Sequence, residues 1–522
     1  MNQLPPARPL REGAVVSAQD TMAADVVIIG SGMGGGTLAW ALKDTGLDVL
    51  IIERGQFLPR EPENSQPDQM FIKKRYVTSK PWYNAHTGQP FQPGVYYWVG
   101  GNTKMYGACM PRFRRSDFTE VIHYDGASPA WPFNYDDLEP FYSQAEELFQ
   151  VHGSVDEDPT EPPHSTDYPY PPLPHEPAVE RFANMLYLQG LHPFHMACAM
   201  HLPSLAERIA DTTADGSPSA TGNKSDAENR VIRPALESPT VRLLLGAYVR
   251  RLHTDGNTVR HAEVEVGERT VGIEAKTFVV SGGAANSAAL LLRSVSDQHT
   301  DGLGNSSGLL GRNYMVHNST FFLAVDPRRR NDTAWQKTLG LNDWYEAGPQ
   351  TPYPLGNLQM LGKLQAPMVK AARPWAPMWA LKMVTDRSLD IYLMTEDLPR
   401  PGNRVTVERD KILISWTPNN ITPHLELVKR VRQAVRVAGY PIVLTERMGI
   451  ATNSHMCGTA VAGTDPASSV LDPNCRSHDV TNLYVVDSSF FPSSAALNPA
   501  LTIAANALRV APIIAQATGS TR

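Results

Sequence analysis

The chain contains little cysteine. Its 522 residues include four, none of them in a CxxC motif: Cys109, Cys198, Cys457 and Cys475. Zinc and iron–sulfur sites need clustered ligands and disulfide frameworks need more cysteines, so we predict no metal site and no disulfide framework. Few, scattered cysteines suit a reducing compartment, and we therefore expect a cytoplasmic protein.

Other signals are also missing. The N-terminus lacks a charged segment followed by an apolar run, so no secretory signal is predicted. No stretch of about 18 or more continuous apolar residues is found, so no membrane span is expected. The net charge of −6 argues against nucleic acid as a partner. The apolar fraction of 42% is typical of a globular protein, and the length predicts two or three folding units.

A glycine-rich turn stands near the start of the chain. Residues 24–55 predict a strand, this turn, a helix and a second strand, and the turn matches G-x-G-x-x-G through Gly30, Gly32 and Gly35. Glu53 ends the second strand, where it can accept hydrogen bonds from the ribose of an adenosine. Such a loop lets a pyrophosphate approach a helix N-terminus, which predicts dinucleotide binding. The alternative is an ordinary glycine turn and an ordinary acidic strand end.

Further stretches, in the same order along the chain, resemble one family. They are residues 100–107, 131–142, 311–317, 396–399, 403–405, 453–459, 482–487 and 497–501. With the glycine loop, they make the chain similar to the glucose–methanol–choline (GMC) flavin oxidoreductases over nearly its whole length. Within that family, residues 224–228, 336–340, 469–472 and 490–494 most resemble bacterial pyranose oxidases, C-glycoside 3-oxidases and glucoside 3-dehydrogenases.

The resemblance implies an α/β fold with two interleaved domains. We predict a Rossmann-like FAD-binding domain and a substrate-binding α+β domain built on an antiparallel sheet. The FAD-binding domain takes residues 24–125, 236–317 and 441–522, and the substrate-binding domain takes residues 126–235 and 318–440. Residues 1–23 are expected to form a flexible arm. The polar segment near 202–228 is expected to be a mobile loop.

The resemblance also implies a catalytic pair. His455 matches the family's histidine before a Gly-Thr pair, and an imidazole with an ordinary pKa of about 6.5 can accept a proton at neutral pH. Asn498 matches the second position, and an amide can orient a hydroxyl but cannot act as base. The alternatives are a buried structural histidine and an asparagine that caps the helix beginning near Pro499.

Several residues are expected to hold the cofactor. The resemblance places Gly101, Asn102 and Gly107 near flavin N5 and O4, Val249 beside adenine, and Asp487 near the ribityl and pyrophosphate groups. Asn498 and Leu501 open a helix whose N-terminus is expected to face the pyrimidine edge of the flavin. Fungal pyranose oxidases attach their flavin through a histidine where this chain has Met105, so we predict non-covalent FAD.

The predicted reaction is the oxidation of a secondary ring hydroxyl, at C2 or C3, of a sugar or glycoside. Oxygen or a soluble carrier is expected to accept the electrons, and Glu396 and Trp416 are the predicted substrate contacts. Three alternatives stay open at this stage. The substrate can be an aminoglycoside, a cyclitol or a non-sugar alcohol, the protein can be a non-redox lyase that retains its flavin, or the flavin can be purely structural. The number of chains in the assembly is not indicated.

Overall fold

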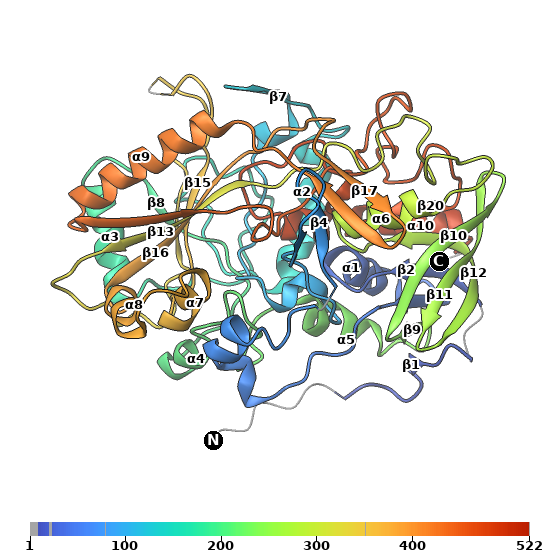
Figure 1. Cartoon of the computed structure of the whole chain (residues 1–522), viewed down its shortest axis with the longest axis horizontal. Helices are drawn as coiled ribbons and strands as arrows, with labels where there is room; N and C mark the ends of the chain where they lie inside the picture. The colour runs from blue at the N-terminus through green and yellow to red at the C-terminus, as the bar shows by residue number, and fades with distance from the viewer. Residues whose placement is uncertain (1–8, 20–22, 79, 350, 521–522) are drawn as a thin grey trace.

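The computed structural model describes residues 9–19, 23–78, 80–349 and 351–520. Two large sheets form its two halves, one at each side of the molecule in Figure 1. Each sheet draws its strands from segments far apart in the sequence, so the chain passes repeatedly between the halves. The predicted mixed α/β class is confirmed.

The first sheet contains the Rossmann-like unit. Its strand order is β1-β9-β3-β2-β12-β11-β10, and β20 pairs with β12 beside this path. The apolar runs 26–29 and 49–52 are buried on both faces, as parallel central strands require. The strands are β1 (Val15–Val16), β2 (Ala23–Ile29), β3 (Val49–Ile52), β9 (Val241–Leu244), β10 (Ala247–Asp255), β11 (Thr258–Val266), β12 (Arg269–Val280) and β20 (Leu483–Val485).

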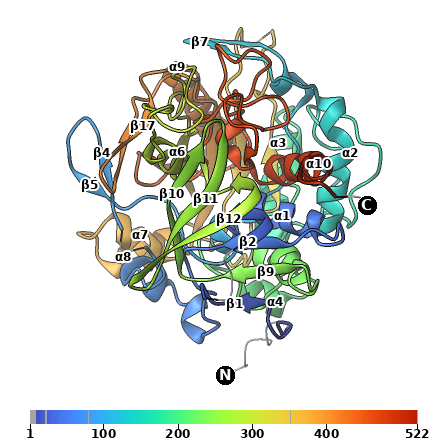
Figure 2. The same ribbon diagram turned by 90° about the vertical axis from the view of Figure 1, so that its right-hand side faces the viewer.

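Helices α1 (Met33–Leu42), α2 (Tyr135–Phe149) and α10 (Ala500–Thr518) pack beside this sheet. α10 contacts both α1 and α2, and Figure 2 shows the three close together. Among the helices that the structure describes, α10 is the one whose length and composition would allow it to cross a membrane, whereas the sequence predicted no such segment. Because 67% of its apolar window is buried inside the protein, the packing of a core helix accounts for that composition.

The second sheet is antiparallel and has the order β19-β13-β16-β15-β14-β8. Side chains alternate between its faces. One face, with Phe322, Met360 and Ile391, packs against α3 and α9, which leaves the other face for a site. The strands are β8 (Pro193–His195), β13 (Asn318–Val325), β14 (Leu339–Leu341), β15 (Asn357–Met360), β16 (Ser388–Thr395) and β19 (Ile442–Arg447), and the helices are α3 (Pro177–Tyr187) and α9 (Ile421–Val437).

Smaller elements connect the halves. A third sheet has the order β17-β18-β4-β5, so strands more than 300 residues apart pair in it. The remaining strands are β4 (Trp82–Asn84), β5 (Pro90–Phe91), β6 (Val121–His123), β7 (Gly126–Ser128), β17 (Arg404–Glu408) and β18 (Lys411–Ser415). The remaining α-helices are α4 (Leu205–Ala210), α5 (Arg233–Ala235), α6 (Ala284–Arg293), α7 (Ala366–Ala372) and α8 (Met378–Thr385).

The packing departs from three predicted boundaries. β19 lies within residues 441–522 but pairs with β13 in the second sheet. α2 lies within residues 126–235 but packs against α10 beside the first sheet. β1 lies in the predicted N-terminal arm but pairs with β9. The division into two functional domains stays a prediction, with these three elements reassigned.

The segment 202–228 is not a loose loop. It contains α4, and the carboxylate of Asp211 accepts hydrogen bonds from the N–H groups of Ala220 and Thr221. Lys224 is fully buried, and its Nζ lies 2.6–3.0 Å from four carbonyl oxygens, which share its three hydrogens: those of Lys104, Tyr106, Ala214 and Ser217. The polar side chains that suggested exposure instead bond to one another and to the backbone.

Replacing this ammonium tests its structural role. Lys224→Met leaves four carbonyl oxygens without their shared donor, so the free energy of unfolding is expected to fall by about 3 kcal/mol or more. Urea denaturation measures the change. Lys429→Met, at a side chain 76% exposed, is the control and is expected to change stability by no more than about 0.5 kcal/mol. Equal effects of the two substitutions would contradict this account.

Candidate active site

A cavity of about 1270 Å³ lies between the two halves. Its walls are the glycine loop after β2, the segments 92–97 and 101–109, one face of the second sheet, and the C-terminal segments near 452–456 and 498–503. A site for one small molecule usually measures roughly 300–1,000 Å³. This cavity therefore has room for a cofactor and a substrate together.

The glycine loop is packed tightly on one side and open on the other. Gly30 has φ +108°, and a Cβ there would lie 2.3 Å from the carbonyl oxygen of Ser281. A Cβ on Gly35 would lie 2.1 Å from the carbonyl oxygen of Gly30. A Cβ on Gly32 would meet no atom within 4 Å, because this residue faces the cavity. Gly32 thus leaves the space that a pyrophosphate needs to reach the N-terminus of α1.

Glu53 supports this loop. One oxygen of its carboxylate accepts from the N–H (3.1 Å) and the hydroxyl (2.6 Å) of Ser31, and the other accepts from the N–H of Gly55 at 2.8 Å. The side chain is buried and lines the cavity. The oxygen that accepts only from Gly55 retains a lone pair that can accept from a ribose hydroxyl.

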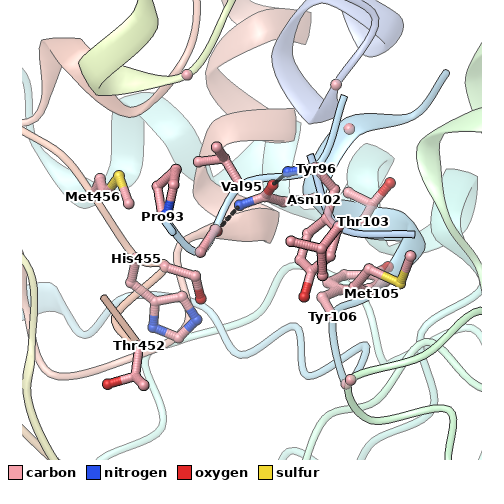
Figure 3. A pocket seen from close by; sticks show the side chains of 18 of the residues that line it. Pro93, Val95, Tyr96, Asn102, Thr103, Met105, Tyr106, Thr452, His455 and Met456 are labelled. Atoms are coloured by element: carbon pink, nitrogen blue, oxygen red, sulfur yellow. Dashed lines mark hydrogen bonds between the residues drawn. The ribbon is translucent and has the colours of Figure 1, made fainter. Parts of the chain in front are cut away.

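Asn102 lies in the middle of the cavity wall. Its Oδ1 accepts from the N–H of Tyr96 at 2.9 Å, and its Nδ2 donates to the carbonyl oxygen of Gly94 at 3.1 Å. Figure 3 shows these bonds, with His455 on one side of Asn102 and Met105 and Tyr106 on the other. The side chain of Asn102 therefore holds the segment 94–96 in place, and its backbone is the part left for a ligand.

The other two glycines predicted to hold the cofactor lie in the cavity wall, as does Val249. Gly101 and Gly107 line the cavity with Val249, which is 4% exposed. Gly101 has φ +56°, in the left-handed region that favours glycine. A Cβ on Gly107 would lie 2.5 Å from Nζ of Lys337, so this glycine lets a charged group approach the cavity wall.

Asp487 and Asn498 both reach the cavity. Asp487 accepts from the N–H of Gly283 at 2.9 Å and from the hydroxyl of Ser287 at 2.6 Å, and burial raises the pKa of its carboxyl. Asn498 does not cap α10, whose N-cap is Pro499 without a side-chain bond. Oδ1 of Asn498 is buried and has no hydrogen-bond partner among the described residues. A buried amide oxygen of this kind needs a bound group to satisfy it.

Leu501 was predicted to contact the cofactor, but its side chain does not line the cavity. It is fully buried in the main core, and Ala500 and Ile503 line the cavity instead. The helical period directs the side chain of residue 501 to a different face of α10 from those of Ala500 and Ile503. Its backbone N–H, in the first turn of α10, is the part that can face a ligand.

His455 lies opposite a second histidine. Met315 and Cys457 form an antiparallel bridge through N–H to carbonyl bonds of 3.1 and 2.9 Å. His317 follows Met315 by two residues and His455 precedes Cys457 by two, so this antiparallel register places them opposite each other, and their Nδ1 atoms are 3.0 Å apart. His317 belongs to the 311–317 stretch that resembles the family, but nothing in the sequence indicates this pairing, so no role was predicted for it.

The second histidine fixes the proton positions. Nε2 of His317 lies 3.2 Å from the carbonyl oxygen of Ser494, an acceptor, so Nε2 carries the hydrogen. Burial lowers the pKa of His317 to about 4, so the ring is neutral and its Nδ1 is a bare acceptor. His455 must then donate from Nδ1. Burial, with smaller effects of His317 and Lys337, lowers the pKa of His455 well below its ordinary value. Its Nε2 is therefore an unprotonated base.

The two predicted substrate contacts are wrong. Glu396 accepts from the hydroxyl of Ser128 at 2.5 Å and pairs with His123 at 3.1 Å, beside a separate cavity of about 360 Å³. Trp416 donates from Nε1 to Asp397 at 2.8 Å. Neither lines the large cavity, because buried partners from other segments satisfy both side chains.

Met105 is relevant to covalent attachment of the flavin, and the cysteines are relevant to metal binding. Met105 is buried in the cavity wall, and a thioether offers no nitrogen for a covalent bond to flavin. Over the described ranges, no group of three or more His, Cys, Asp or Glu side chains is arranged to hold a metal ion. The four cysteines are buried and free.

Comparison with models of known protein families identifies the family of this chain. Two family models described as GMC oxidoreductase match residues 206–319 and 414–507, and an NAD(P)-binding Rossmann-like model matches residues 28–58. The chain belongs to the GMC oxidoreductase family. It is an oxidoreductase of CH–OH groups, and its cofactor is FAD, which GMC oxidoreductases typically bind non-covalently. The predicted family, enzyme class and cofactor are confirmed.

Relatives span nearly the whole chain. Paromamine 6'-oxidase of Streptomyces fradiae is 29% identical, over 94% of this chain and 91% of that protein. The fructose dehydrogenase large subunit of Gluconobacter japonicus is 25% identical, over 95% and 98%. The fold is shared with pyridoxine 4-oxidase from Mesorbium loti, at a TM-score of 0.63 and 21% identity, over 94% and 98%. The similarity to pyranose and glycoside 3-oxidases stays a prediction.

The residues present fit FAD. The open face of Gly32, the N-terminus of α1 and Glu53 suit a pyrophosphate and a ribose. The unpartnered oxygen of Asn498 and the N-terminus of α10 suit the polar edge of an isoalloxazine ring.

A substitution at Gly32 tests this fit. Gly32→Ala has room in the protein but places a methyl group where the pyrophosphate is expected, so FAD affinity should fall about ten-fold or more. Isothermal titration of FAD into apoprotein measures the loss. Gly402→Ala, at another open glycine without a positive φ, is the control. The account is contradicted if Gly32→Ala binds FAD as tightly as the wild type while its apoprotein unfolds normally.

Proposed function

We propose that this enzyme oxidises a secondary ring hydroxyl, at C2 or C3, of a neutral sugar or glycoside. The observation that carries the proposal is the bare Nε2 of His455 in the same cavity as the unpartnered Oδ1 of Asn498. The hydroxyl of a ring carbinol can be oriented by Asn498, and its proton can be removed by His455. The name of one relative, the fructose dehydrogenase large subunit, supports this substrate class.

Residues of the chain itself remove the proton of the substrate hydroxyl. Nε2 of His455 accepts the hydroxyl proton, and the Nδ1 bond to His317 holds the ring in the tautomer that can do so. Because the hydroxyl has a single hydrogen, which points to Nε2 of His455, the amide of Asn498 orients this hydroxyl by donating from Nδ2 to its oxygen. When bound, FAD supplies the hydride acceptor at N5. The second sheet and the segment 94–97 form walls of this volume.

The charges of the cavity favour an uncharged substrate. Among the described lining residues, the acidic groups outside the nucleotide region are paired: Asp215 with Lys337 at 2.8 Å, and Glu446 with Arg373. Glu53 and Asp487 are engaged with the backbone of the nucleotide region. A ligand with several ammonium groups would find no unpaired carboxylate there, whereas a neutral sugar needs none.

An aminoglycoside is the second candidate. Two relatives at 29% identity, paromamine 6'-oxidase and 6'''-hydroxyparomomycin C oxidase of Streptomyces lividus, carry names of that class. Lys337 in the cavity wall disfavours an ammonium group close to it. The two candidates therefore differ in how an amino substituent on the ring affects binding.

Anaerobic flavin reduction tests the proposal. Mixing the holoenzyme with D-glucose, alkyl and aryl glucosides, D-glucosamine and paromamine should bleach the visible flavin band with neutral sugars first. His455→Ala should retain the yellow cofactor and lose turnover by about 10²–10⁴-fold, because the base is gone. Preference for paromamine favours the second candidate. Bond cleavage without bleaching by any alcohol would point to a lyase and overturn the proposal.

A second test addresses the tautomer. His317→Phe removes the acceptor for Nδ1 of His455, so kcat/KM is expected to fall by about 10-fold or more. His317→Gln keeps both an acceptor and a donor in one side chain and should restore part of the rate. Steady-state kinetics measures both. Equal losses in the two variants would mean that His317 acts through packing alone.

The pH profile of the wild type has a predicted sign. His455 must be unprotonated, and its pKa lies well below the ordinary value, so activity should be lost only as the pH falls well below about 6.5. The profile of kcat/KM measures this limb. An acid limb above about 7 would contradict the buried, neutral histidine pair.

A further inference from the structure

Gln359 is a buried polar residue without a structural explanation. It lies on β15, is 0% exposed, and lines the large cavity. Its Oε1 has no hydrogen-bond partner among the residues that the structure describes. Its Nε2 contacts Sδ of Met394 at 3.9 Å, which is a weak acceptor. An amide in this state destabilises the fold, because its hydrogen bonds with water are lost and not replaced.

The sheet aims this amide at the cavity. Glu446, Phe321, Tyr392 and Gln359 are successive partners across β19, β13, β16 and β15, and all four line the cavity. Their neighbours along each strand point to the opposite face, where α3 and α9 pack. Tyr392 donates its hydroxyl to Ser319 at 2.9 Å, and Glu446 pairs with Arg373. Gln359 is thus the polar member of this row that lacks a strong partner.

A charged pair adjoins the same part of the cavity. Nζ of Lys337 lies 2.8 Å from Oδ2 of Asp215, which also accepts from the N–H of Gly362 at 2.8 Å. Lys337, Asp215 and Gly362 line the cavity, and Gly362 follows Gln359 by three residues. Lys337 is also close enough to His455 to contribute to the lowering of its pKa. Asp215 therefore connects this cation to the segment that directly follows β15, the strand of Gln359.

We propose that Gln359, with Lys337 beside it, anchors a second hydroxyl of an uncharged polyhydroxylated ring whose neighbouring carbinol reaches His455. The inference rests on the proposed function and specifies its substrate class. The free Oε1 accepts from a ring hydroxyl, and Nζ of Lys337 donates to a hydroxyl oxygen. A ligand with one hydroxyl group cannot satisfy the base and the anchor at once. Gln359 is a residue of substrate specificity and takes no part in the proton transfer.

Gln359→Met tests the anchor, because methionine has nearly the same shape and no amide. We expect the KM for the best neutral sugar to rise about ten-fold or more, which corresponds to about 1.4 kcal/mol. The Tm of the variant without substrate should rise, since the unpartnered amide is gone. Monodeoxy derivatives of the sugar identify the hydroxyl. Wild type should discriminate against one of them, and Gln359→Met should bind that derivative and the parent sugar equally.

Asn357→Ala is the matched control. Asn357 lies on the same strand and is also buried with an unpartnered Oδ1, but it does not line the cavity. It should lower Tm and leave KM unchanged. The anchor is wrong if Gln359→Met, with flavin bound, keeps the wild-type KM and discrimination while wild type is reduced by sugars. If no sugar reduces the wild-type flavin, the proposed function fails, and the anchor fails with it.

Discussion

A single hydrogen bond, between the Nδ1 atoms of His317 and His455, determines what the site can do. Without it, either nitrogen of His455 can carry the hydrogen. With it, and with the carbonyl oxygen of Ser494 behind His317, only Nε2 of His455 is left bare. The bond joins residues 138 positions apart, so the rest of the fold must hold two distant segments in register. The bridge between Met315 and Cys457 does this locally.

The larger architecture supports the same geometry. α10 packs against α1 and α2, and thereby brings Asn498 to the glycine loop that follows β2. The second sheet buries one face under α3 and α9 and presents the other to the cavity. Cofactor loop, base and sheet wall therefore meet in one volume, although they come from the first, middle and last parts of the chain. Removing water from that volume strengthens each polar interaction inside it.

The features predicted correctly are those that neighbouring residues determine. The apolar run before Gly30, the glycines after it and the acidic residue at position 53 are a local pattern with a local physical reason, and the structure has them as expected. His455 and Asn498, which were chosen because the sequence around them matches the family's motifs, likewise both line the cavity. Their catalytic roles stay predictions.

The features predicted wrongly depend on distant partners. Nothing in the sequence near Glu396 indicates that its carboxylate will bind Ser128 and His123. Likewise, nothing near Trp416 indicates that Asp397 will accept its hydrogen bond. Lys224 seemed to belong to a polar loop. Its four acceptors are backbone carbonyl oxygens, and the sequence gives no sign of where these lie. Gln359 carries no sequence signal either, since its orientation follows from the strand pairing alone.

The most direct test of the account is the position of the hydrogens on the two rings. A neutron structure of the deuterium-exchanged protein at neutral pH locates them. The account predicts deuterium on Nε2 of His317 and on Nδ1 of His455, and none on Nε2 of His455. Deuterium on Nε2 of His455 would show that the ring cannot accept the hydroxyl proton, and would contradict the central claim.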